Sequence, residues 1–136
     1  MKTAVNVKAP IKSYKDLIVW KESMNFVQDV YRVSSEFPKS EHLVLTSQMR
    51  RAAVSVPSNI AEGWSRNTAG SFIYFLRIAT GSISELMTQI EIAFRLNYLT
   101  ADKMNDMELR GNQITKMLIA LIRKVEIREK AMKATK

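Results

Sequence analysis

The strongest constraint on the fold is a series of apolar residues that recur at steps of four and three over residues 72–93. This spacing keeps side chains on one face of an α-helix, since the helix completes a turn about every 3.6 residues. Residues 45–60 and 104–125 show nearly the same spacing. The sequence therefore predicts long helices with one apolar face each. These faces comprise Leu45, Met49, Ala52, Val56 and Ile60; Phe72, Leu76, Ala79, Ile83, Leu86, Ile90 and Ala93; and Met104, Met107, Gly111, Ile114, Leu118, Leu121 and Val125.

Another helix is predicted ahead of these three, over about residues 16–36. Asp16 would lie in its first turn, where the helix dipole favours an acid, and Pro38 would follow its end. Its apolar seam is predicted to comprise Leu17, Trp20, Met24, Val27 and Tyr31. The other helices are predicted over about 41–66, 70–97 and 101–129, with a basic tail at 1–15 and a frayed tail at 130–136.

Short connections between these helices favour an all-α fold, an antiparallel up-down-up-down four-helix bundle in a single domain of 136 residues. Seams with a period near 3.5 residues favour left-handed packing. Pro57 lies inside the second helix and lacks the N–H that would bond to the Ala53 carbonyl. We therefore expect a kink or a short break near Pro57.

Polar stripes accompany the apolar faces of the second and third helices. One comprises Gln48, Arg51, Ser55, Asn59, Glu62 and Arg66, and the other Arg77, Gly81, Ser84, Thr88, Glu91 and Arg95. If these helices pair antiparallel across a loop near Gly70, positions whose numbers add to about 139 face each other. The facing pairs of this structural polar ladder would be Glu62 with Arg77, Ser55 with Ser84, Arg51 with Thr88 and Gln48 with Glu91. The alternative is a solvated face that happens to be periodic.

The net charge of +8 is concentrated at the two ends of the chain. Residues 16–122 contain eleven basic and eleven acidic residues, so the middle is neutral. Basic ends bind polyanions through phosphate contacts, or they only keep a protein soluble. We expect the main nucleic-acid contacts at Arg123, Lys124, Arg128 and Lys130, with help from Lys12 and Lys15. Arg50 is a secondary candidate, since it lies off both stripes of its helix.

Catalytic, cofactor and metal sites are not expected. The chain has no cysteine, and its single histidine, His42, lacks the Glu-x-x-His spacing of bundle di-iron sites. It has neither a phosphate-binding glycine loop nor a nucleophile elbow. We therefore expect a non-enzymatic protein. It has no stretch near the ~20 apolar residues of a membrane span and no secretory signal, so we expect a cytoplasmic location and no membrane partner.

Several segments carry a family resemblance: Val19-Trp20-Lys21, Phe37-Pro38-Lys39, residues 45–52, residues 55–63, and residues 75–82 with Glu85. In order, spacing and identity they resemble the bacterial four-helix-bundle family encoded in intervening sequences of 23S ribosomal RNA genes. This family is also called the S23 ribosomal protein family. The resemblance covers about residues 16–100, and the last helix is similar to the family only in its pattern.

The resemblance implies a four-helix bundle that assembles as a ring-like homopentamer. A distantly related branch, the accessory variability determinant of diversity-generating retroelements, binds nucleic acid and a reverse transcriptase, but this chain is more similar to the intervening-sequence branch. Taken with the charge, the resemblance suggests a homo-oligomeric bundle that binds nucleic acid, with RNA favoured. The alternative is an oligomeric scaffold whose partner is another protein.

Overall fold

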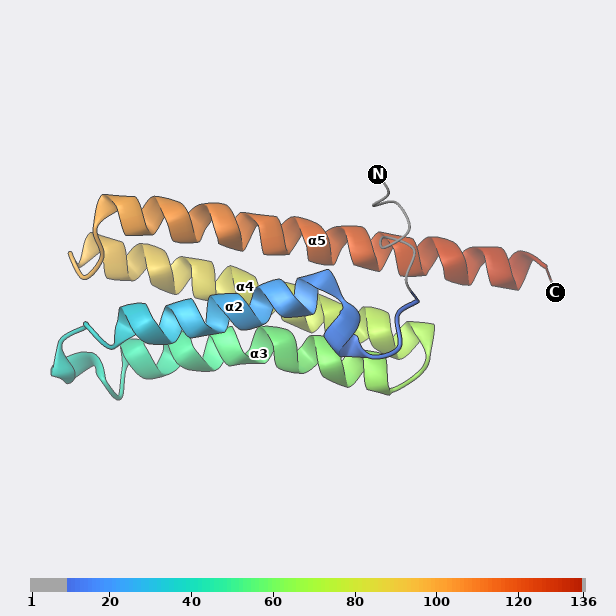
Figure 1. The fold of residues 1–136 in the computed structure, drawn as a ribbon, viewed down its shortest axis with the longest axis horizontal. Helices are drawn as coiled ribbons and strands as arrows, with labels where there is room; N and C mark the ends of the chain where they lie inside the picture. The colour runs from blue at the N-terminus through green and yellow to red at the C-terminus, as the bar shows by residue number, and fades with distance from the viewer. Residues whose placement is uncertain (1–9, 136) are drawn as a thin grey trace.

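The structure, a computed structural model, describes residues 10–135. Within this range the chain forms four α-helices and two short 3-10 helices, with no strand. The α-helices are α2 (Ile18–Ser34), α3 (Leu45–Ser65), α4 (Ala69–Arg95) and α5 (Ala101–Ala134), and the 3-10 helices are η1 (Tyr14–Asp16) and η2 (Lys39–Glu41). Figure 1 shows consecutive helices running in opposite directions, joined at the two ends of the molecule. The predicted all-α four-helix fold is confirmed, and left-handed packing stays a prediction.

The apolar faces predicted for the second and third helices form the centre of the core. Every residue assigned to them on α3 and α4 is buried. On α5 the match holds through Leu118, after which Ile122 is buried and Leu121 is only half-buried. In a straight helix, a strict seven-residue repeat gradually rotates away from the core. The buried position after Leu118 is therefore four residues on, at Ile122, and not three residues on, at Leu121.

The predicted seam of the first helix is wrong at most of its positions, because only Leu17 of its five residues is buried. The residues of α2 that face the core are Val19, Ser23, Phe26, Val30 and Val33. Met24 and Tyr31 are exposed, and Trp20 and Val27 are half-buried. Two overlapping series of residues both have helical spacing, and only the contact with α3 selects between them. Ser23 joins the core because its hydroxyl donates a 2.7 Å hydrogen bond to the Val19 carbonyl.

The predicted ends of the chain also change. The predicted basic tail, residues 1–15, includes the first two residues of η1, which contacts α2 and α3, while residues 1–9 lie outside the described range. Ser13 and Asp16 form a capping box around η1, so α2 begins only at Ile18. At the other end, α5 continues past residue 129 to Ala134. Residues 130–134 contain only helix-forming side chains and no glycine or proline, which favours this extension.

Helices α3 and α4 share the most extensive interface in the bundle. It is close at Gly63, where an added Cβ would lie 2.7 Å from the Cβ of Phe75. Trp64 packs at this end, with its ring 5.8 Å from that of Phe72 in an edge-to-face arrangement. Helix α3 is continuous through Pro57, so the short break considered for this position does not occur. A kink there stays a prediction.

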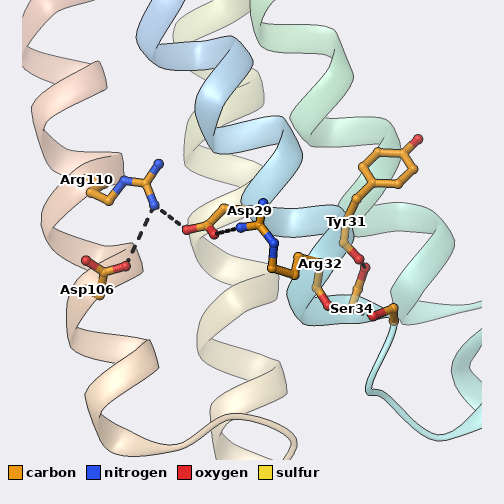
Figure 2. A network of polar contacts seen from close by, with 7 residues as sticks. Asp29, Tyr31, Arg32, Ser34, Asp106 and Arg110 are labelled. Carbon is orange, nitrogen blue, oxygen red and sulfur yellow. Dashed lines mark hydrogen bonds and ion pairs between the residues drawn. The ribbon is translucent and has the colours of Figure 1, made fainter.

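Helices α2 and α5 touch least among the neighbouring pairs, and a charged cluster joins them. Asp29 of α2 is buried, and it forms ion pairs with Arg32 on its own helix and with Arg110 of α5. Figure 2 shows Arg110 placed between Asp29 and Asp106. The Arg110 guanidinium also lies 5.4 Å from the centre of the Phe26 ring. This cluster closes the bundle where apolar contact is sparse.

Candidate nucleic-acid interface

The four basic residues predicted as the main contacts lie on the C-terminal half of α5, and all four side chains are exposed. Among residues 10–135, none of the four has an acidic partner. The two acidic residues of this segment are already paired. Glu126 binds Arg77 of α4 at 2.8 Å, and Glu129 lies 3.7 Å from Lys133. The positive charge of this segment is therefore accessible and uncompensated.

Helical geometry divides these side chains into two rows. Arg123 and Lys130 are seven residues apart and share one face, while Lys124 and Arg128 are four apart and share another. The last turns of α5 run past the connection between α3 and α4, so solvent reaches them from several sides (Figure 1). This part of the helix can accept a polyanion along its length.

A shallow hollow of about 380 Å³ lies between α4 and α5 next to the first row. Its lining includes Arg77, Thr80, Arg123 and Glu126, so two guanidinium groups face one carboxylate across it. The sequence assigned Arg77 to the polar ladder and missed it as a neighbour of Arg123. The sequence did contain an indication that Arg77 is exposed. Every position of its stripe, from 77 to 95, is a hydrophilic residue or glycine, which is typical of a solvent-exposed face.

The other three candidates are separated from α5 to different degrees. Lys12 and Lys15 are exposed on the N-terminal segment, which lies toward the same end of the bundle as the C-terminal half of α5 (Figure 1). Arg50 lies near the opposite end and has a structural role. Its Nε donates to the Ser34 hydroxyl at 2.9 Å, and its guanidinium lies 4.6 Å from the centre of the Tyr31 ring. The structure therefore does not bring Arg50 together with the other candidates.

The polar ladder between α3 and α4 does not form as predicted. Glu62 pairs with Arg66 on its own helix at 2.7 Å, and Arg77 pairs across to α5. The hydroxyl of Ser55 meets Ser82 at 2.8 Å, and Ser84 is exposed.

Of the two polar stripes, only Ser55 and Asn59 of α3 lie at the contact with the other helix. On α3, the Asn59 amide donates to the Ser55 hydroxyl at 2.9 Å, so these two residues line the interface with Ser82. The α4 stripe is turned outward instead. On α4, Thr88 is exposed and Glu91 pairs with Arg95 of its own helix at 2.9 Å. Gln48 and Arg51 of the α3 stripe are exposed as well. The α4 stripe is therefore a solvated face, which was the alternative. Ser82, which lies outside the stripe, makes the polar contact with α3.

A second hollow, of about 520 Å³, lies where α2 and α3 are joined. Its lining includes Ser35, Lys39, His42, Thr46 and Arg50. From the sequence, His42 is considered only as a metal ligand, and Lys39 and Thr46 have no predicted site role. The turn signal Phe37-Pro38-Lys39 just before a helix start was the available indication that basic side chains gather here.

No group of three or more histidine, aspartate and glutamate side chains in residues 10–135 is placed to hold a metal ion. None of the helices there has the length and apolar character needed to cross a lipid bilayer. The basic surface of α5 and the two hollows are thus the features to compare with known proteins.

A family model described as 23S rRNA-intervening sequence protein matches residues 15–120. Among solved structures, the chain is similar to a protein with unknown function from the S23 ribosomal protein family of Bacteroides thetaiotaomicron VPI-5482. The two chains share 24% sequence identity at a TM-score of 0.72, and the match covers 77% of this chain and 98% of that one. No curated protein sequence matches the chain. The structural likeness supports the fold.

Proposed function

This chain belongs to the 23S rRNA-intervening sequence protein family, and from that premise we propose that it is a non-enzymatic, homo-oligomeric bundle that binds nucleic acid in the cytoplasm. The observation that carries the proposal is the uncompensated charge of α5. Arg123, Lys124, Arg128 and Lys130 are exposed, and the neighbouring carboxylates of Glu126 and Glu129 are occupied by other cations. Such a surface gains affinity for a polyanion by releasing its counterions.

RNA is the polymer that this proposal favours, from the basic charge taken together with the family resemblance. The geometry of α5 suits contacts to the phosphate backbone, which depend on charge and spacing and not on base sequence. The hollow between α4 and α5 adds Arg77 beside Arg123. We infer a broad preference for structured or single-stranded RNA with little base specificity.

Self-association would strengthen this binding. The outward face of α4 exposes Tyr74 and Ile92, and Gly81 between them has open space around its Cα. An apolar pair that flanks a small residue suits close packing against another subunit. The homopentamer implied by the family resemblance would repeat the basic surface in every subunit, and linked weak sites raise the effective concentration of the ligand.

The test is charge reversal of three residues, Arg123→Glu, Lys124→Glu and Arg128→Glu, in the full chain. RNA and DNA affinities are measured from low to moderate salt. Affinity falls with salt, and the steepness of log affinity against log salt should decrease by about two. Three phosphate contacts are lost, and each contact to a single strand contributes about 0.7. The matched control is Lys21→Glu, Arg51→Glu and Lys103→Glu, which changes the net charge equally on other surfaces.

The proposal fails if the reversed variant keeps its oligomeric state and binds as tightly as the wild type. It also fails if the wild type binds neither polymer at low salt. The second outcome favours the alternative of a protein scaffold, for which the exposed apolar residues of α4 are the supporting observation.

A further inference from the structure

The hollow at the connection between α2 and α3 is rich in cations and hydrogen-bond donors. It has a volume of about 520 Å³, and its lining within residues 34–50 includes Lys39, His42 and Arg50 but no acidic side chain. Figure 1 shows this connection at the end of the bundle opposite the C-terminal turns of α5. It is therefore a separate feature from the proposed nucleic-acid surface.

Thr46 is the most informative residue in the lining. It is only 3% exposed, and its hydroxyl makes no hydrogen bond to any residue that the structure describes. Among residues 10–135, only Gln89 Oε1 is a fully buried side-chain N or O atom without a partner, so the Thr46 oxygen is accessible to a ligand. Thr46 therefore offers a donor that lines the hollow and is unused within the protein.

The start of α3, where Thr46 lies, has further backbone donors. Its N-cap residue, Val44, forms no side-chain cap, and the Leu45 N–H donates a long 3.4 Å hydrogen bond to the Glu41 carboxylate. The N–H groups of the next two residues, Thr46 and Ser47, have no acceptor from the preceding turn. Unpaired N–H groups at the start of a helix carry partial positive charge and favour anions.

One cation of the lining, Arg50, is held in position before any ligand binds. The Arg50 guanidinium donates to the Ser34 hydroxyl at 2.9 Å and to the Tyr31 carbonyl at 3.3 Å. Figure 2 shows both partners near the end of α2. A guanidinium fixed in this way loses little conformational entropy when an anion arrives. Lys39 and His42 are exposed at the rim, where they can adjust to the ligand.

We propose that this hollow binds a terminal phosphate group, that is, a phosphate monoester or inorganic phosphate. Thr46 and the first N–H groups of α3 donate to its oxygens, while Arg50, Lys39 and His42 balance its charge. A dianion with several acceptor oxygens matches this set of donors better than a carboxylate, which has only two oxygens. The proposal does not depend on RNA binding by α5.

The test follows amide resonances of the intact protein during titration with inorganic phosphate at constant ionic strength. Saturable shifts are expected at Thr46 and Ser47. Thr46→Val should weaken binding by about tenfold, since it removes a hydrogen bond to a charged ligand, whereas Thr46→Ser should retain it. The double variant Lys39→Gln/His42→Gln should also weaken binding, and the control Lys21→Gln/Lys103→Gln should not.

Two further ligands identify the source of the phosphate. A short RNA with a 5′-phosphate is compared with the same RNA ending in a 5′-hydroxyl, and both are titrated into the α5 charge-reversal variant. A phosphate-dependent shift at Thr46 with this RNA assigns the hollow to an RNA end, and a shift with inorganic phosphate alone assigns it to a small phosphorylated ligand. The proposal is overturned if neither ligand shifts Thr46, if acetate does so equally, or if Lys39→Gln/His42→Gln binds phosphate like the wild type.

Discussion

Ser23 shows how a polar residue enters the core of this bundle without an unsatisfied group. Its hydroxyl donates to a carbonyl one turn earlier, and the side chain is otherwise surrounded by apolar neighbours. Small hydroxyl residues can therefore replace apolar ones at a helix seam. Hydropathy alone ranks such a position as surface, which is why the seam of α2 was misassigned.

Ile83 tests the energetics of the core at a single position. It is 1% exposed at the centre of the α4 seam, so Ile83→Ala should cost about 2–5 kcal/mol of unfolding free energy through lost burial and a cavity. Ile119→Ala is the control, because Ile119 is 44% exposed and should cost much less. Denaturant unfolding of both variants measures the difference, and equal costs would remove Ile83 from the core.

Asp16 provides a test of pH dependence. Hydrogen bonds from the backbone N–H groups of Lys12 and Ser13 lower the pKa of its carboxyl group below 3.8. Because the folded pKa is lowered, the carboxylate stabilises the N-terminal turn at higher pH. This contribution is lost as the pH falls through the folded pKa.

Carboxyl NMR titration should therefore give Asp16 a midpoint below 3.8, with the Lys12 and Ser13 amides shifting over the same pH range. Asp16→Asn should abolish that step in the amide shifts. A midpoint at or above 3.8 would contradict the hydrogen-bonded geometry of this turn.

At the scale of whole elements, the four helices differ in how they are held. Helix α3 lies against α4 along a close interface that includes Gly63, whereas α2 and α5 have little contact and rely on the Asp29 cluster. Charged groups at a sparse interface fix the relative position of two helices because their geometry is directional. The Asp29 cluster should therefore set how α2 sits against α5.

A double-mutant cycle tests this role. Asp29 is 6% exposed, so Arg110→Met should leave its charge poorly compensated and cost about 1–3 kcal/mol, with Arg32 as the remaining partner. Adding Asp29→Leu should recover part of that cost, which gives a coupling energy above about 0.5 kcal/mol. The exposed pair Glu91–Arg95 is the control, and a coupling no larger than in that pair would show that the cluster is incidental.

Several large apolar side chains lie on the surface of the molecule. Ile18, Leu43, Tyr74, Leu109 and Ile127 are each at least 60% exposed. Scattered apolar residues are common on surfaces, but several large exposed ones in one small bundle favour contacts between subunits. The basic surface of α5 would then be repeated by symmetry.

We predict that light scattering after size exclusion gives five times the protomer mass at micromolar concentration. Tyr74→Glu should shift the protein toward smaller species, because it places a charge on the outward apolar face of α4. Lys116→Glu is the control on another exposed surface. A stable monomer for the wild type would contradict the prediction, and an unchanged mass for Tyr74→Glu would exclude this face from the interface.

Much of the fold was determined by local pattern. The seams of α3, α4 and most of α5 follow from helical periodicity, because a long run of apolar residues at steps of three and four has one stable way to be buried. The exposure of Arg123, Lys124, Arg128 and Lys130 is also local, since charged side chains without partners remain in solvent. These features need no knowledge of the neighbouring helices.

Tertiary structure decided which face of each helix meets which neighbour. The rotation of α2, the pairing of Arg77 with Glu126 and the burial of Thr46 depend on the positions of distant helices. A rotation of one residue, about 100° around the axis, exchanges a core residue for an exposed one at almost no local cost. Only the total packing energy between the helices distinguishes such arrangements, and this energy depends on several segments of the chain at once.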